Sequence, residues 1–184
     1  GIWTDHPAVN FVTVTRDEET QRPDPDRLAA RVSRAFLGVR IDCARCHDHP
    51  FQPWKQADFR GLAAFFGGVR SNLRGVTDAA NEYRPLDHKT KEPVDVAPAV
   101  PSHPELVPTE GTPRARLAGW VVDPRNPYFG RAAVNRVWAV LFGRPLVDPI
   151  DDIPDDAEIP PALDLLAADF VEHGHDLRRL IRAI

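Results

Sequence analysis

The 19 prolines of this chain decide where it can form helices. Proline inside a helix removes a backbone hydrogen bond and clashes with the preceding turn. Six prolines stand between residues 85 and 108, so the sequence predicts no long helix across residues 69–112. Short strands could fit there, beside a turn at residues 89–92. A segment of this length without regular structure is typically functional or a linker.

Apolar residues recur at helical spacing on both sides of that segment. The first predicted helix has Asp26 as its N-cap and ends at Gly38. Five more are expected at about residues 56–66, 113–122, 128–142, 161–173 and 177–184. The predicted fold class is therefore mainly α: helical domains with a long irregular, proline-rich middle segment that has room for short β-hairpins.

The helix expected at residues 128–142 is the longest of these. Its predicted buried face runs from Ala133 to Leu141 and Phe142. Asn135 and Arg136 stand among apolar neighbours, and polar residues in such places typically form buried networks between helices. We expect a structural role for this pair.

Composition excludes several classes of function. The 23 basic and 27 acidic residues are spread along the chain, so the sequence has neither a basic footprint for nucleic acid nor a polybasic membrane patch. No apolar run approaches the roughly 18 residues of a membrane span. The chain has no methionine, and both of its ends look cut. We expect a fragment of a longer protein, whose signal peptide would lie outside it.

The two cysteines form a Cys-x-x-Cys-His motif with Cys43, Cys46 and His47. A c-type haem is bonded to two thiols through its vinyl groups, and its iron needs an axial imidazole. The motif places both thiols on one side of a tight turn and directs the following histidine to the iron. The sequence therefore predicts covalently attached haem c, with His47 as one axial ligand.

Three other interpretations of the motif remain open. The two thiols and a histidine could hold zinc with a fourth ligand from elsewhere in the chain. They could instead form a disulfide or a redox-active pair, although no βαβ pattern follows the motif. Two inert, buried thiols are the third alternative, which the polar neighbours Arg45 and Asp48 disfavour.

The other axial position of the iron has no obvious ligand. Methionine is absent, and His49 lies only two residues beyond His47, a reach of about 7 Å that cannot pass round a porphyrin. Asp48 and His49 are instead expected to tune the iron from outside its coordination shell. An open distal position is compatible with the sequence. The remaining candidates for a distal ligand are His6, His88, His103, His173 and His175.

Aromatic residues follow the motif closely. Phe51 and Trp54 lie in the loop itself and are the expected wall of a haem site, whereas Phe59, Phe65 and Phe66 fit the core of the next helix.

Residues 36–51 (FLGVRIDCARCHDHPF), with residues 62–66 (LAAFF), resemble the planctomycete cytochrome C-type domain of unknown function. Residues 116–120 (RLAGW), 134–138 (VNRVW) and 141–144 (LFGR) resemble the partner domain of unknown function that follows it. The resemblance implies three segments: the C-terminal part of the haem-attachment domain (1–70), a connecting segment (71–112) and the N-terminal part of the helical partner domain (113–184). It also implies a large exported protein.

Three hypotheses about function follow. The first is a haem c module that passes electrons within a larger, exported oxidoreductase assembly. Its partner would be a redox protein or another domain of the parent protein, and its location the periplasm, where haem is attached. The second is a haem enzyme with an open distal site. The third is a non-haem structural or interaction domain, in which the motif holds zinc or a disulfide.

Overall fold

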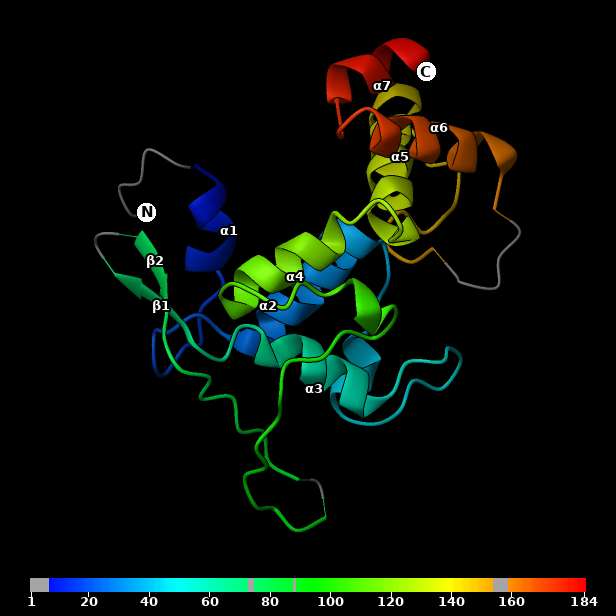
Figure 1. Ribbon diagram of the computed structural model, residues 1–184. Coiled ribbons are helices and arrows are strands. Elements are labelled where there is room, and N and C mark those ends of the chain that lie inside the picture. Colours follow the sequence, from blue (N-terminus) through cyan, green and yellow to red (C-terminus); the bar gives the residue numbers. More distant parts are fainter. Residues whose placement is uncertain (1–6, 73–74, 88, 154–158) are drawn as a thin grey trace. The chain divides into compact units, whose positions relative to one another are not determined.

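The computed structural model describes residues 7–72, 75–87, 89–153 and 159–184 (Figure 1). Its α-helices are α1 (Asn10–Thr13), α2 (Pro25–Val32), α3 (Gln56–Ala64), α4 (Pro113–Val121), α5 (Pro127–Phe142), α6 (Pro161–Glu172) and α7 (Leu177–Ala183). A π-helical turn (Ser33–Leu37) continues α2, and short 3-10 turns span Pro7–Val9, Asp42–Arg45 and Pro104–Leu106. Strands β1 (Val69–Asn72) and β2 (Gly75–Asp78) pair antiparallel. The predicted mainly α class is confirmed.

Contacts divide the chain into two compact units. The first comprises residues 1–31 and 41–118, and the second comprises residues 32–40 and 119–184. The three segments predicted from the sequence stay a prediction.

The start of α2 corrects the sequence analysis. Asp24, not Asp26, caps this helix, because its Oδ1 accepts hydrogen bonds from the backbone N–H groups of Asp26 (2.9 Å) and Arg27 (3.1 Å). Pro25 occupies the first helical position, where its missing N–H costs nothing. The Asp26 side chain is therefore available for other partners.

The first unit is built on α2 and α3. Leu28 of α2 and the α3 residues Phe59 and Leu62 are almost fully buried. Gly61 lets the irregular segment pack on α3, since a Cβ atom there would lie 2.9 Å from Ala99. The Ala99 N–H donates to the Gly61 carbonyl at 3.1 Å. The proline-rich segment is thus irregular but anchored to a core helix.

The predicted turn at residues 89–92 is present. Its flanks meet in a single antiparallel bridge between Leu86 and Pro93, and the Asp87 N–H donates to the Glu92 carbonyl at 2.9 Å. The hairpin of the described chain, β1–β2, lies nearer the start of the segment, with Val69 opposite Asp78.

The second unit packs α5 against α6 and α7. Its core consists of Val134, Leu163, Ala167, Phe170 and Leu180. The prediction that the buried face of α5 extends to its last turn is wrong. Leu141 is 46% and Phe142 54% exposed, because the last turn of α5 extends past the core of its unit.

Asn135 and Arg136 have the structural role expected from the sequence. Asn135 is fully buried, and its side-chain amide pairs with both backbone groups of Val147, at 2.8 and 3.0 Å. The Arg136 guanidinium donates to the carbonyls of Arg34 and Ala35 within the π-helical turn. The Asn135 bonds pair backbone groups of the loop after α5, and the Arg136 bonds pair carbonyls of the π-helical turn.

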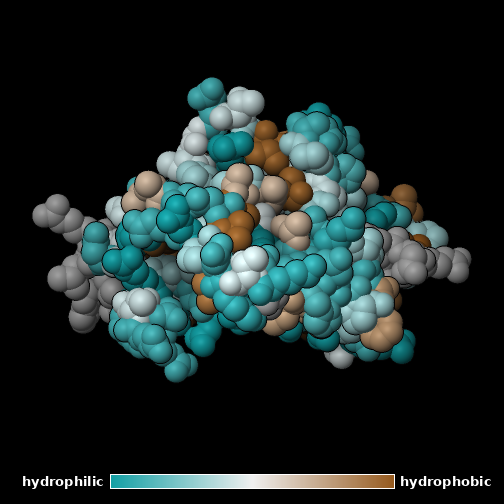
Figure 2. Space-filling model, turned by 90° about the horizontal axis from the view of Figure 1, so that it is seen from below, coloured by the Kyte–Doolittle hydropathy of each residue, from teal (hydrophilic) through white to brown (hydrophobic). Residues whose placement is uncertain are grey.

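Hydrophilic side chains predominate on the face shown in Figure 2, where hydrophobic residues form only small groups. Among the residues that the structure describes, no helix is long and apolar enough to cross a membrane.

Candidate cofactor-attachment site

The cysteine turn, defined as residues 42–47, begins as a 3-10 turn in the first unit. Ala44 is fully buried and its N–H donates to the Ile41 carbonyl at 2.9 Å, which anchors the turn to the core. Cys43 and Cys46 are both exposed and carry free thiols. The turn thus buries Ala44 and leaves both cysteine residues exposed to solvent, where a ligand can reach them.

The His47 imidazole is exposed and oriented by the backbone. Its Nδ1 lies 2.7 Å from the Asp48 carbonyl oxygen. A carbonyl oxygen only accepts hydrogen bonds, so Nδ1 carries the proton and Nε2 of the neutral ring keeps its lone pair. This is the tautomer that coordinates a metal through Nε2, with the Nδ1 hydrogen bond fixing the ring.

His49 has a different task in the structure. The side-chain Nδ1 of His49 accepts hydrogen bonds from the backbone N–H groups of Phe51 (3.2 Å) and Gln52 (3.0 Å). The backbone N–H of His49 donates to the Trp54 carbonyl at 2.8 Å. The ring therefore closes the loop that follows the cysteine turn. A tuning role toward iron stays a prediction for His49.

Gln56, the first residue of α3, holds the carbonyl groups of the cysteine turn. Its side-chain amide donates to the carbonyls of Arg45 (3.1 Å) and Cys46 (2.9 Å). Its backbone N–H donates to Oδ1 of Asp48 at 2.9 Å. The Asp48 carboxylate thus satisfies an N–H at the start of α3, where the helix dipole favours negative charge.

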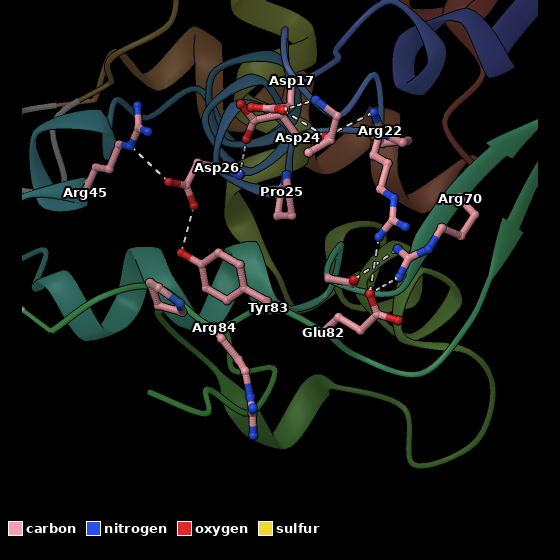
Figure 3. Close-up of a pocket in the computed structure, with 14 residues that line it drawn as sticks. Asp17, Arg22, Asp24, Pro25, Asp26, Arg45, Arg70, Glu82, Tyr83 and Arg84 are labelled. Atoms are coloured by element: carbon pink, nitrogen blue, oxygen red, sulfur yellow. Dashed lines mark hydrogen bonds and ion pairs between the residues drawn. The ribbon is translucent and has the colours of Figure 1, made fainter. Parts of the chain in front are cut away.

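A second set of contacts joins the cysteine turn to α2 (Figure 3). Nε of Arg45 donates to Oδ2 of Asp26 at 2.9 Å, and the Tyr83 hydroxyl donates to Oδ1 of the same carboxylate at 2.7 Å. Burial of the Tyr83 ring, with the charge of Asp26 and their hydrogen bond, raises the pKa of its hydroxyl well above the usual range. The hydroxyl therefore remains protonated and able to donate.

These three side chains border a cavity of about 380 Å³. Four arginines and four acidic residues line it, so the cavity has no surplus of either charge. Arg22 and Arg70 share Glu82, at 3.5 and 2.5 Å.

The two aromatic residues predicted to wall a haem lie in opposite environments. Phe51 is 92% exposed, whereas Trp54 is 5% exposed and donates its indole N–H to Gln52 at 2.7 Å. The Phe51 ring thus exposes apolar surface to solvent in the first unit. Contact of either ring with haem stays a prediction.

The described residues contain no group of three or more His, Cys, Asp and Glu side chains that could hold a metal ion. A zinc site needs four donors gathered around the ion, whereas a haem iron needs only one from this motif, since the thiols bond to carbon. Cys43, Cys46 and His47 supply the two thiols and the imidazole that haem c attachment uses, and both haem and zinc stay predictions.

The structure does not assign a distal ligand. His6 and His88 lie outside the described residues. In the first unit, Nδ1 of His103 lies 3.5 Å from the Glu105 carboxylate. In the second, His173 contacts Asp169, and the ring of His175 packs on Phe129 and Phe170: their centroids are 5.1 and 5.2 Å away.

Sequence reasoning missed Gln56 and Tyr83, and it gave Asp26 the wrong role. Glutamine at a helix start is unremarkable by its type, and Tyr83 meets Asp26 across 57 residues of sequence. For Asp26 a signal existed, because proline at the first helical position places the cap one residue before it.

Comparison with known families gives two matches. Residues 3–71 match the family model PSCyt2, described as a protein of unknown function (DUF1549). Residues 113–184 match the model PSD1, described as a protein of unknown function (DUF1553). The two parts of the chain are thus similar to two families whose functions are not established. No curated protein and no solved structure matches the chain significantly.

Proposed function

We propose that the first unit attaches a haem c through thioether bonds to Cys43 and Cys46, with His47 as an axial ligand of the iron. The observation that carries the proposal is the geometry of His47: its Nδ1 lies 2.7 Å from the Asp48 carbonyl oxygen, which leaves Nε2 as the ring nitrogen that can coordinate iron.

The environment of the thiols supports the same proposal. Both cysteines are exposed and unpaired, as attachment to the vinyl groups of a haem requires. The nearby Phe51 ring is almost fully exposed, and contact with a haem would remove this apolar surface from water. The name PSCyt2 of the family matched by residues 3–71 also suggests a cytochrome association.

When bound, the haem would supply a one-electron redox couple. The protein would bond the cofactor through two sulfur atoms, orient His47 through Asp48 and hold the turn through Gln56. We propose electron transfer within a larger oxidoreductase assembly, with a redox protein or another domain of the parent protein as partner. Haem c attachment implies export to the periplasm.

The test is expression of the chain with the haem-maturation machinery, followed by acid–acetone extraction. We expect the Soret band to stay with the protein and Cys46→Ala to retain less haem. Val140→Ala, at an exposed position of the second unit, is the matched control and should retain haem fully. Stoichiometric zinc without a retained Soret band would overturn the proposal. A Cys43–Cys46 disulfide in a protein that holds neither haem nor zinc would overturn it as well.

The spin state separates electron transfer from catalysis. Electron transfer predicts a six-coordinate, low-spin ferric iron. A high-spin iron that binds added ligands would favour the alternative of a haem enzyme with an open distal site.

A further inference from the structure

Arg45 holds the cysteine turn in place. It lies in the sequence between Cys43 and Cys46, and its side chain points to α2. Its carbonyl accepts from Gln56 of α3 at 3.1 Å, while its guanidinium donates to Asp26 of α2 at 2.9 Å. One residue thus joins the segment between the sulfur atoms to two core helices. Movement of either helix would be passed to the spacing and direction of the thiols.

Asp26 is well placed to give such a contact a fixed geometry. It lies in the first turn of α2, two residues before the fully buried Leu28, and its side chain is only 21% exposed. A carboxylate at a helix N-terminus is favoured by the helix dipole. The Tyr83 hydroxyl holds the second oxygen at 2.7 Å, so the carboxylate cannot rotate without losing a hydrogen bond.

The ion pair itself can contribute little to folding. The Arg45 side chain is 57% exposed, and ion pairs of this kind are weak because water screens them. A geometric role explains the arrangement better than a stabilising one. The balanced charges of the adjoining cavity likewise give no reason to assign a charged ligand to it.

We propose that Asp26 is a positioning residue for haem attachment: it holds Arg45, and with it the segment between Cys43 and Cys46, against α2, while Tyr83 fixes the carboxylate. The role in haem attachment rests on the proposed function. The claim that Asp26 holds Arg45 and the cysteine turn in place can be tested on the protein without haem.

The first experiment uses the reduced apo-protein. Asp26→Asn keeps the shape of the side chain and an acceptor for Tyr83 but removes the charge that holds Arg45. Hydrogen exchange of the amides in residues 43–48 should accelerate about three- to fivefold, and the ratio of the alkylation rates of the two thiols should change. Tyr83→Phe should produce a smaller change of the same kind.

The matched control is Asp95→Asn. It breaks the ion pair between Asp95 and Arg84, a residue that lines the same cavity; the Arg84 Nε lies 2.5 Å from Oδ1 of Asp95, and neither residue belongs to the cysteine turn. This variant should leave exchange and alkylation within twofold of the wild type. If Asp26→Asn behaves like Asp95→Asn, the proposal is overturned.

The second experiment uses the haem-loaded protein. Asp26→Asn should shift the ferric electron paramagnetic resonance signals that report the orientation of the His47 ring, and Asp26→Glu should restore them in part. A spectrum identical to that of the wild type would contradict the proposal. If the wild type itself retains no haem, the proposed function fails, and the apo-protein exchange data still decide the role of Asp26.

Discussion

The side-chain amide of Gln56 donates a hydrogen bond to the main-chain carbonyl of Cys46 at 2.9 Å. The same amide donates to the Arg45 carbonyl at 3.1 Å. Gln56 begins α3, whose residue Phe59 is 1% exposed in the core of the first unit. The position of the second thiol is thereby tied to a helix that is itself fixed by packing.

Gln56→Glu should loosen this contact. The glutamate has the same shape but no N–H, so it places a charged acceptor against two carbonyl groups. We expect the amides of residues 46–48 to exchange hydrogen about tenfold faster, in line with about 1–2 kcal/mol for the lost bonds. Hydrogen-exchange mass spectrometry measures this. Gln21→Glu is the control, because the Gln21 amide donates only to Glu18 in an exposed turn. Equal exchange in both variants would contradict the role of Gln56.

His49→Asn and His49→Gln should differ in effect. The Nδ1 atom of His49 accepts two backbone N–H groups, and Oδ1 of asparagine lies at the same distance along the side chain. Oε1 of glutamine corresponds to Nε2 instead. We expect His49→Asn to keep exchange of the Phe51 and Gln52 amides within about twofold and His49→Gln to accelerate it about fivefold or more, as measured by NMR. Rescue by glutamine rather than asparagine would show that Nε2 is the functional atom.

The helices could be predicted because their limits are local. Gly38 and Gly143 end the first and the longest predicted helices in left-handed conformations, at φ values of 66° and 75°, as the sequence suggests. The predicted helix at residues 128–142 is observed as Pro127–Phe142. Burial was less predictable, because exposure of Leu141 and Phe142 depends on where the neighbouring helices end, which periodicity does not record.

In the candidate site, too, local features could be predicted and long-range contacts could not. The spacing of Cys43, Cys46 and His47 is local and could be identified from the sequence, whereas the contacts that hold them are not. Tyr83 reaches Asp26 from the irregular proline-rich segment, whose path depends on packing such as that of Ala99 on Gly61. The identity of the cofactor stays a prediction from the motif and the state of the donors.

Asn135→Leu should destabilise the second unit. Leucine fits the apolar surroundings, but it leaves both backbone groups of Val147 without their partner. Unpaired groups of this kind cost about 1–3 kcal/mol each, so we expect unfolding free energy to fall by about 2–4 kcal/mol in urea titrations. Val140→Ala, on the same helix at a position 78% exposed, should change it by less than about 0.5 kcal/mol. A loss no larger than that of the control would show that water replaces Asn135 at little cost.

Asp78→Asn should change the pH dependence of stability. Arg114 donates two hydrogen bonds to the Asp78 carboxylate, at 2.6 and 2.8 Å, and these hold the pKa of Asp78 below its usual value near 3.8. Because the folded-state pKa is lowered, the contact stabilises the protein above the unfolded-state pKa and loses this effect as pH falls through the folded-state pKa. We expect the unfolding free energy of the wild type to exceed that of Asp78→Asn by about 1–2 kcal/mol at pH 7. The difference should shrink as the pH falls through the lowered folded-state pKa of Asp78. Urea unfolding of both proteins between pH 7 and pH 2 measures it. Asp95→Asn, which removes a solvent-exposed pair, should show a smaller difference. A difference between wild type and Asp78→Asn that stays constant over this pH range would mean that the carboxylate charge does not stabilise the contact.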